Sequence, residues 1–191
     1  MREALLCKNS AFFASASKVE WKEGQEHRVP LPDDVPSVVD MYVNWLYTGK
    51  IFCRHSQDER RTSEYKLLIS GYEFGEKVQD DGFRNAVVDS LIHAAATPNK
   101  AGQCWYPGLS MVDKAYKVTP EGSPLRRLIT TFHLNCGNDN WLRGDMNREF
   151  LTDLTKCLLR DKKASGQKSP TLPNISSCQY HHHSKGERCY S

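Results

Sequence analysis

The sequence feature that most constrains the fold is the stretch VPSVVDMYVNWLYTG, residues 35–49. Its apolar residues recur every three or four positions, which is the period of an α-helix. Pro36 suits a first helical turn, and Asp33 and Asp34 place negative charge and a cap before it. Gly49 stands where helices end in the left-handed conformation. The stretch therefore predicts a helix with an apolar face that ends at Thr48 and Gly49.

The aromatic residues of this helix indicate a second role besides core packing. Successive helical residues are about 100° apart, so one narrow face cannot bury every large side chain of the stretch. We expect Tyr42, Trp45 and Leu46 to point chiefly inward, and Met41 and Tyr47 to lie nearer the surface. Tyr and Trp are favoured at protein interfaces, so the stretch fits both a core helix and a binding surface.

Most of the remaining chain has helical spacing too. Gly71 and Gly75 lower the helix propensity of one expected helix, and their small size predicts close packing against a neighbour. HRVPLP, residues 27–32, alternates like a strand, and Pro30 would confine it to a sheet edge. Residues 50–52 predict a brief strand or an extended exit. The sequence thus predicts a mostly helical chain with very little strand. Further helices are expected at about 2–9, 10–18, 63–78, 81–94, 110–117, 125–132 and 147–160.

Two of these helices carry further signals. Ser10 can cap the second helix of the chain. In the last helix the apolar residues at helical spacing are expected to point inward, and they are Phe150, Leu151, Leu154 and Leu158.

Composition excludes several classes of function. The net charge of +3 on 26 basic and 23 acidic residues gives no strong attraction to nucleic acid or to an anionic membrane. No run of about 18 apolar residues occurs, and the N-terminus lacks a secretory signal. The cysteines are odd in number and scattered, which favours reduced thiols and a cytoplasmic or nuclear location. They are Cys7, Cys53, Cys104, Cys136, Cys157, Cys178 and Cys189.

The sequence lacks the common catalytic motifs. The sequence has no phosphate-binding Gly-rich loop, no Gly-x-Ser-x-Gly and no His-Glu-x-x-His. His27, His55, His93 and His133 are isolated from one another. We therefore expect a protein that is not an enzyme and needs no cofactor.

The C-terminal segment differs in composition from the rest. Residues 164–177 resemble a linker, and the basic residues at 160–168 indicate a solvated stretch or a weak nuclear-import signal. Cys178, His181 and Cys189 in CQYHHHSKGERC are suitable zinc ligands, but a fourth donor is not obvious. The favoured interpretation is a flexible tail without metal, with these three residues as weak candidates.

The order of the segments resembles a known family. ALLCKNSAFFASASK, HRVPLPDDVPSVVDMYVNWLYTGKI and YKLLISGYEFGEKVQDDGFRNAVVDSLI together resemble the BTB/POZ domain of filamentous fungi. YPGLSMVDKAYKVTPEGSPLRRLI and REFLTDL resemble the helical extension of those proteins. The resemblance covers about residues 2–160.

The resemblance implies an α+β, mostly helical BTB/POZ fold with a C-terminal helical extension. The domain would span 1–96, the extension 97–163, and the flexible linker and tail 164–191. Family members usually carry their first strands before the point at which this chain starts. A BTB/POZ domain lacking those strands is therefore expected, and a truncated gene product is one explanation for it.

The resemblance also implies a function. Family members are non-catalytic protein–protein interaction modules that form homo- or heterodimers, and some are substrate adaptors of cullin ubiquitin ligases. A transcription- or chromatin-associated scaffold and a nonfunctional fragment are the alternatives; the nearly neutral charge argues against a zinc-stabilised nucleic-acid binder. The expected partner-binding residues are Leu5, Leu6, Phe12, Phe13, Met41, Trp45 and Tyr47.

Overall fold

The computed structural model describes residues 3–53, 62–99, 102–136, 145–163, 175–183 and 189. Every regular element within them is helical, which confirms the mostly helical prediction. The strands expected at 27–32 and 50–52 are not formed among these residues, and both segments are irregular. The helices are α1 Glu3–Asn9, α2 Ala11–Ala16, α3 Lys22–Glu26, α4 Pro36–Thr48, α5 Thr62–Val78, α6 Asp81–Ala96, α7 Leu109–Val118, α8 Pro124–Cys136, α9 Arg148–Lys163 and the short 3₁₀ helix η3 Ser177–Tyr180.

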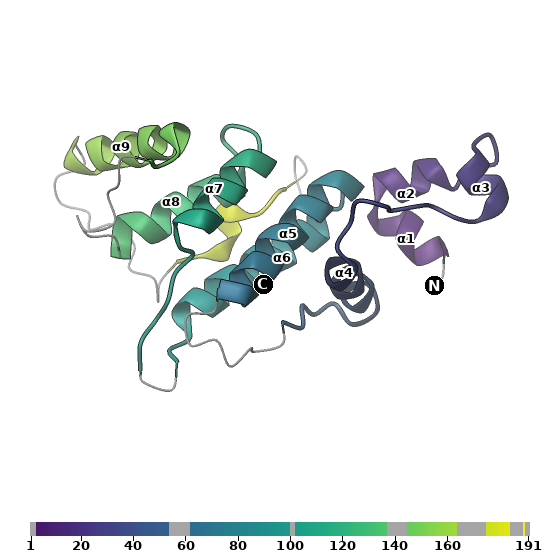
Figure 1. Cartoon of the computed structure of the whole chain (residues 1–191), viewed down its shortest axis with the longest axis horizontal. Coiled ribbons are helices and arrows are strands. Elements are labelled where there is room, and N and C mark those ends of the chain that lie inside the picture. The colour runs from purple at the N-terminus through teal and green to yellow at the C-terminus, as the bar shows by residue number, and fades with distance from the viewer. Residues whose placement is uncertain are drawn as a thin grey trace.

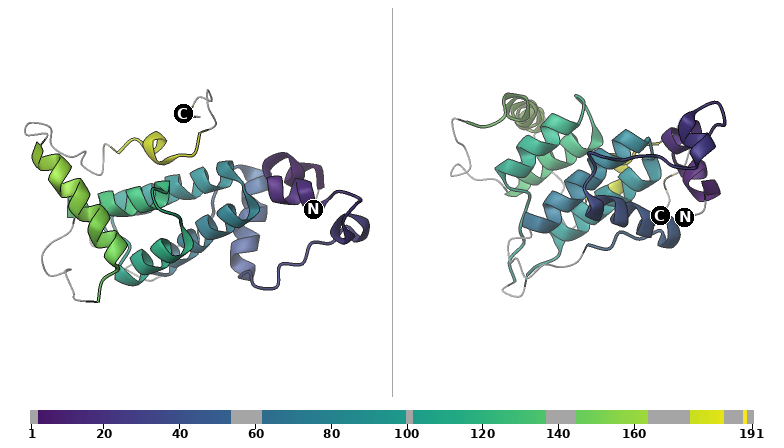
Figure 2. Two further views of the ribbon diagram at one scale, coloured as in Figure 1. Left: turned by 90° about the horizontal axis from the view of Figure 1, so that it is seen from above. Right: turned by 45° about the vertical axis from the view of Figure 1, so that its right-hand side comes forward.

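The helices are arranged around the pair α5 and α6, which lie side by side through the middle of the molecule (Figure 1). The small helices α1, α2 and α3 form one end, where α2 packs against α5, and α4 also packs against α5. Helices α7, α8 and α9 form the opposite end, as the view from above also shows (Figure 2). None of the helices in the described part of the chain has the length and apolarity that crossing a membrane requires.

Helix α4 packs closely on α5 because α5 carries glycine at the contact. A Cβ atom on Gly71 would lie only 2.2 Å from Cε of Met41. Met41 is consequently 3% exposed, and its predicted position near the surface is wrong. Tyr42 and Leu46 are buried as predicted, and Tyr47 is 54% exposed. The missing side chain at Gly71 of α5 thus allows the Met41 side of α4 to face the core.

A buried corner joins α4 to the start of α6. Asp80 caps α6, and its Oδ1 accepts a hydrogen bond from the Phe83 backbone N–H at 2.9 Å. Its Oδ2 accepts a second bond, also 2.9 Å long, from the Tyr42 hydroxyl. The cap predicted for α4 is different in the structure. Val35 precedes that helix without a side-chain bond, and Asp34 instead pairs with Lys77 at 2.6 Å.

The C-terminal helices enclose a second part of the core. Arg126 of α8 is buried and donates to the backbone oxygen of Tyr116 at 2.7 Å, which ties α8 to α7. Phe150 of α9 is fully buried against these helices, as the spacing predicted. Leu158, also expected inward, is 49% exposed, so the apolar face of α9 is covered only over its first turns.

The tail is docked where residues 175–183 are described, which corrects the prediction of a flexible tail for this part. Helix η3 packs against α6 and α8. Tyr180 is buried, and its hydroxyl donates to Oγ1 of Thr131 at 3.0 Å. Asn85 of α6 exchanges two hydrogen bonds with the backbone of His182, at 2.7 and 3.0 Å. Residues 164–174 of the predicted linker lie outside the described residues.

The corner at Asp80 leads to a first prediction. Asp80→Ala removes a helix cap and leaves the buried Tyr42 hydroxyl without its acceptor, so the free energy of unfolding should fall by roughly 2–4 kcal/mol. Urea unfolding measures this loss. Asp33→Ala, at an exposed position just before α4, is the control and should change stability by less than about 0.5 kcal/mol.

The conservative variant Asp80→Asn separates the hydrogen bonds from the charge. Burial raises the pKa of the Asp80 carboxyl, so the folded chain holds that proton more tightly than the unfolded chain. Wild-type stability therefore declines as the pH rises from the ordinary Asp pKa through the raised one, whereas the variant lacks this dependence. Equal pH dependence of the two proteins in this window would contradict the assignment.

Candidate partner-binding surface

Helices α1, α2 and α3, residues 3–26, form what we call the N-terminal lobe, which is attached to α5 at one buried point. Ser10 caps α2, as predicted, by accepting from the Phe13 backbone N–H at 3.1 Å. The Ser10 hydroxyl donates in turn to the backbone oxygen of Val78 at 2.5 Å. Phe13 is buried beside Tyr42, with 6.3 Å between the ring centroids. This serine and this phenylalanine hold the lobe against the end of α5.

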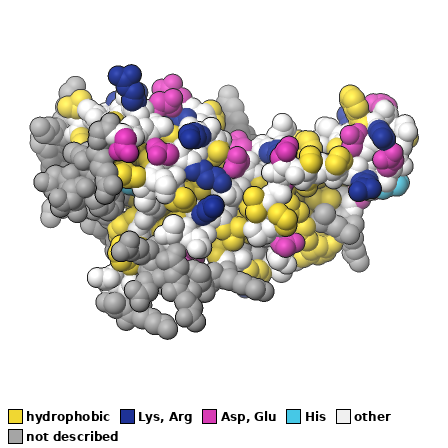
Figure 3. Space-filling view, viewed as in Figure 1, with side chains coloured by type: hydrophobic (Ala, Val, Ile, Leu, Met, Phe, Trp, Pro, Cys, Tyr) yellow, Lys and Arg dark blue, Asp and Glu magenta, His cyan; other side chains and the backbone are white. Residues whose placement is uncertain are grey.

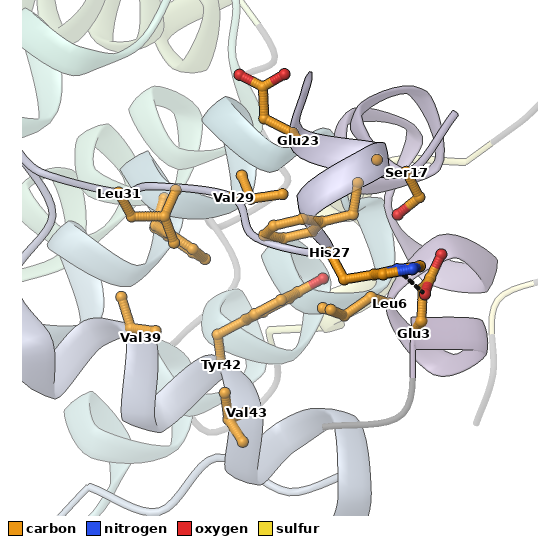
Figure 4. A pocket seen from close by; sticks show the side chains of 13 residues that line it. Glu3, Leu6, Ser17, Glu23, His27, Val29, Leu31, Val39, Tyr42 and Val43 are labelled. Atoms are coloured by element: carbon orange, nitrogen blue, oxygen red, sulfur yellow. Dashed lines mark ion pairs between the residues drawn. The ribbon is translucent and has the colours of Figure 1, made fainter. Parts of the chain in front are cut away.

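A groove of about 340 Å³ lies between the lobe and α4 (Figure 4). Its wall is mostly apolar and includes Leu6, Val29 and Val39. Glu3 and His27 line it too and form an exposed ion pair of 3.4 Å. Apolar clefts of this size bury part of a partner or a small molecule. Because its wall is mostly apolar, the groove is suited to binding an apolar side chain.

The helix α1 has no buried residue, although Leu5 and Leu6 lie within it. It packs mainly on α2, which is itself only six residues long. Helix α3, which sequence analysis did not predict, carries Trp21 at its start, and this indole is largely exposed. The lobe thus presents apolar side chains that the described chain does not cover.

A second exposed apolar area lies where α4 ends, and we call residues 45–53 the α4 exit. Tyr47 is 54% and Phe52 59% exposed, while Trp45 is half-buried with its ring 5.3 Å from that of Phe83. The space-filling view shows hydrophobic side chains gathered over the region of α4 (Figure 3). Gly49 turns the chain with a positive φ of 68° and fixes the direction in which the exit leaves the helix.

The structure divides the predicted partner-binding residues into two groups. Phe13 and Met41 are core residues and cannot contact a partner without rearrangement of the fold. The others are at least partly accessible: Leu5, Leu6, Phe12, Trp45 and Tyr47. Sequence analysis missed Trp21 and Phe52. Each could have been found from the sequence as a large apolar residue beside a polar stretch, where few apolar neighbours are present to bury it.

The remaining candidates fall elsewhere. His27, His93 and His133 lie in different helices or their ends, and His55 is outside the described residues. Of the weak metal candidates, Cys178 and Cys189 lie close together, and Nδ1 of His181 lies 3.1 Å from Sγ of Cys189.

Comparison of the chain with protein-family models, with curated proteins and with solved structures gives no significant match.

The attachment of the lobe can be tested with Ser10→Ala. The change removes the cap of α2 and leaves the backbone oxygen of Val78 without this donor, so we expect the lobe to open more often. Hydrogen exchange of backbone amides in residues 3–26 should accelerate by about tenfold or more, while exchange in α5 and α6 changes little. Ser15→Ala, on the exposed side of α2, should leave both unchanged. Acceleration spread evenly over α5 and α6 would contradict a local attachment.

Proposed function

We propose that the chain is a non-catalytic protein–protein interaction module of the BTB/POZ type, which dimerises through its N-terminal lobe and offers the α4 exit to a second protein. The observation that carries this proposal is that large apolar side chains are exposed at Trp21, just before α3, and at the α4 exit, while the leucines of α1 are only partly buried. Tyr47 and Phe52 of the exit are each more than half exposed.

The poor burial of α1 supports dimerisation through the lobe. A seven-residue helix is marginal by itself, and its stability must come from packing. Within the described chain α1 gains this packing mainly from α2, and Leu5 remains only partly buried. A second copy would cover the same apolar residues in a symmetric contact, which is the commonest arrangement among homo-oligomers. The resemblance to BTB/POZ domains, whose dimers use their first helix, supports this choice.

The α4 exit supports a separate contact with another protein. Exposed aromatic residues beside a fixed turn are typical of interface hot spots, because they add contact area with little loss of side-chain entropy. Cullin-binding members of the resembled family use the surface of the corresponding helix and its exit. A cullin scaffold is therefore the first partner to test, and the chain would act as a substrate adaptor.

Dimerisation predicts a mass that depends on α1. Sedimentation equilibrium of the wild-type chain should give the mass of a dimer at micromolar concentration, and Leu5→Glu should weaken the association by at least about tenfold by placing charge in the contact. Leu159→Glu makes the same change at an exposed leucine of α9 and should leave the dimer intact. A wild-type monomer would contradict the proposal.

The second contact predicts selective loss of partner binding. The double variant Tyr47→Ala/Phe52→Ala should weaken capture of a purified cullin N-terminal domain by at least about tenfold, since hot-spot aromatics each contribute 1 kcal/mol or more. Leu158→Ala/Leu159→Ala removes equally exposed apolar groups far from the exit and is the matched control. If the wild-type dimer binds no cullin, the adaptor role is wrong, whereas dimerisation through α1 is judged by its own measurement.

A further inference from the structure

The three consecutive histidines of the tail point in different directions. His182 faces the helical core, with its Nε2 2.8 Å from the hydroxyl of Tyr72 in α5. His181 and His183 instead approach the two cysteines of the tail. Nδ1 of His181 lies 3.1 Å from Sγ of Cys189, and Nε2 of His183 lies 3.5 Å from Sγ of Cys178. Docking of His182 thus separates its neighbours into a distinct cluster.

The cluster has the dimensions of a metal site. The ligand atoms of Cys178, His183 and Cys189 all lie within 4.8 Å of one another. In a tetrahedral zinc site, Zn–S bonds of about 2.3 Å and Zn–N bonds of about 2.0–2.1 Å place neighbouring ligand atoms about 3.3–3.8 Å apart. The two sulfur–nitrogen distances in the cluster, 3.1 and 3.5 Å, are close to that range. These three residues therefore require only small movements to share one ion, whereas His181, whose Nδ1 lies next to Cys189 but outside this group of three, must move further to join them.

An independent observation concerns the other ring nitrogen of His181. Its Nε2 lies 2.8 Å from Oδ1 of Asp89 in α6, and the side chain of His181 is 1% exposed. A neutral imidazole that donates from Nε2 to a carboxylate keeps the lone pair on Nδ1, which is the nitrogen next to Cys189. Ligating histidines in metal sites are held in this way by a carboxylate. The contact with Asp89 thus holds the buried ring with Nδ1 directed at Cys189, as a ligand would be held.

We propose that Cys178, His181, His183 and Cys189 bind one Zn²⁺ ion in a structural site, with the spacing Cys-x₂-His-x-His-x₅-Cys. Four protein ligands fill a tetrahedral shell and leave no open position for catalysis. Asp89 orients His181 from α6, and this contact links the site to the central helices. The fourth donor that the sequence seemed to lack is supplied because both His181 and His183 take part.

Zinc binding at this site would stabilise the docked position of the tail. Residues 175–183 contact α6 and α8, which belong to the predicted BTB/POZ domain and to its extension respectively. Arg127 of α8 donates to the backbone oxygen of Gln179 at 3.1 Å, and Asn85 of α6 holds His182. All four ligands belong to the tail, so a zinc ion would join Cys178 to Cys189, while Asp89 and Asn85 of α6 and Arg127 of α8 link the tail to the two halves of the chain.

The first test measures zinc in the full-length chain, purified with a non-thiol reductant. Elemental analysis should find one zinc per chain, and replacement by Co²⁺ should give the thiolate charge-transfer and tetrahedral ligand-field bands of a two-sulfur site. Cys178→Ser and Cys189→Ser should each abolish these bands, whereas Cys104→Ser, at an exposed thiol outside the cluster, should keep them. A reduced chain that binds no zinc, or Cys178→Ser and Cys189→Ser proteins that bind it like the wild type, would overturn the proposal.

The histidine run provides matched variants. His181→Ala should lower zinc affinity by at least 100-fold, and Asp89→Asn by about 10- to 100-fold, because it removes the carboxylate that orients the ligand. His182→Ala, one residue away but bonded to Tyr72, should change zinc affinity much less. An equal effect of His181→Ala and His182→Ala would mean that the run acts only through packing, and would contradict ligation.

The wild-type chain also provides a test that needs no folded variant. In the presence of zinc, Cys178 and Cys189 should resist alkylation, Cys104 should react at once, and a chelator should expose the first two. Mass spectrometry of the peptides identifies each labelled thiol. A Cys178–Cys189 disulfide that forms in place of zinc binding, or alkylation of both thiols unaffected by zinc, would overturn the proposal.

Discussion

The buried corner around Asp80 is the interaction on which the rest of the structure depends. Its carboxylate caps α6 and accepts a hydrogen bond from the Tyr42 hydroxyl, so it joins α4 to the central helix pair. The hydroxyl of Ser10 reaches Val78, two residues before Asp80, and attaches the N-terminal lobe at the same place. Burial raises the pKa of both the Asp80 carboxyl and the Tyr42 hydroxyl, so each group depends on the other for compensation.

This corner also decides which apolar surfaces stay exposed. Tyr42 points to Asp80, and Met41 packs on Gly71, so the opposite side of α4 and its exit face solvent. The lobe is held by few contacts, and its α1 remains poorly buried. The end of the molecule formed by α7, α8 and α9 is better packed, because Phe150 is fully buried there and the buried Arg126 joins α8 to α7. The exposed residues of the α4 exit that we assign to partner binding, Tyr47 and Phe52, therefore lie on the side away from the core.

The sequence could predict what depends on neighbouring residues. Gly49 and the cap at Ser10 were found from local rules, and each works within one turn of its helix. Features that depend on distant residues could not be found. Burial of Met41 requires Gly71 of another helix, and α3 is a five-residue helix in a polar stretch without an apolar period. Leu158 matched the helical spacing, but no described helix covers the end of α9 where it lies.

The tail shows the same limit most clearly, because its partners are about 50 to 110 residues away in the chain. Asn85 and Asp89 are one turn apart on α6, and an amide and a carboxylate at that spacing resemble a solvated helix face. Asn85 is nonetheless buried, since it pairs with the backbone of His182, and Asp89 contacts His181. Asn85 and Asp89 therefore fix the orientation of His182 and His181. Of the three consecutive histidines, His182 packs against the core, while His181 and His183 lie beside the cysteines.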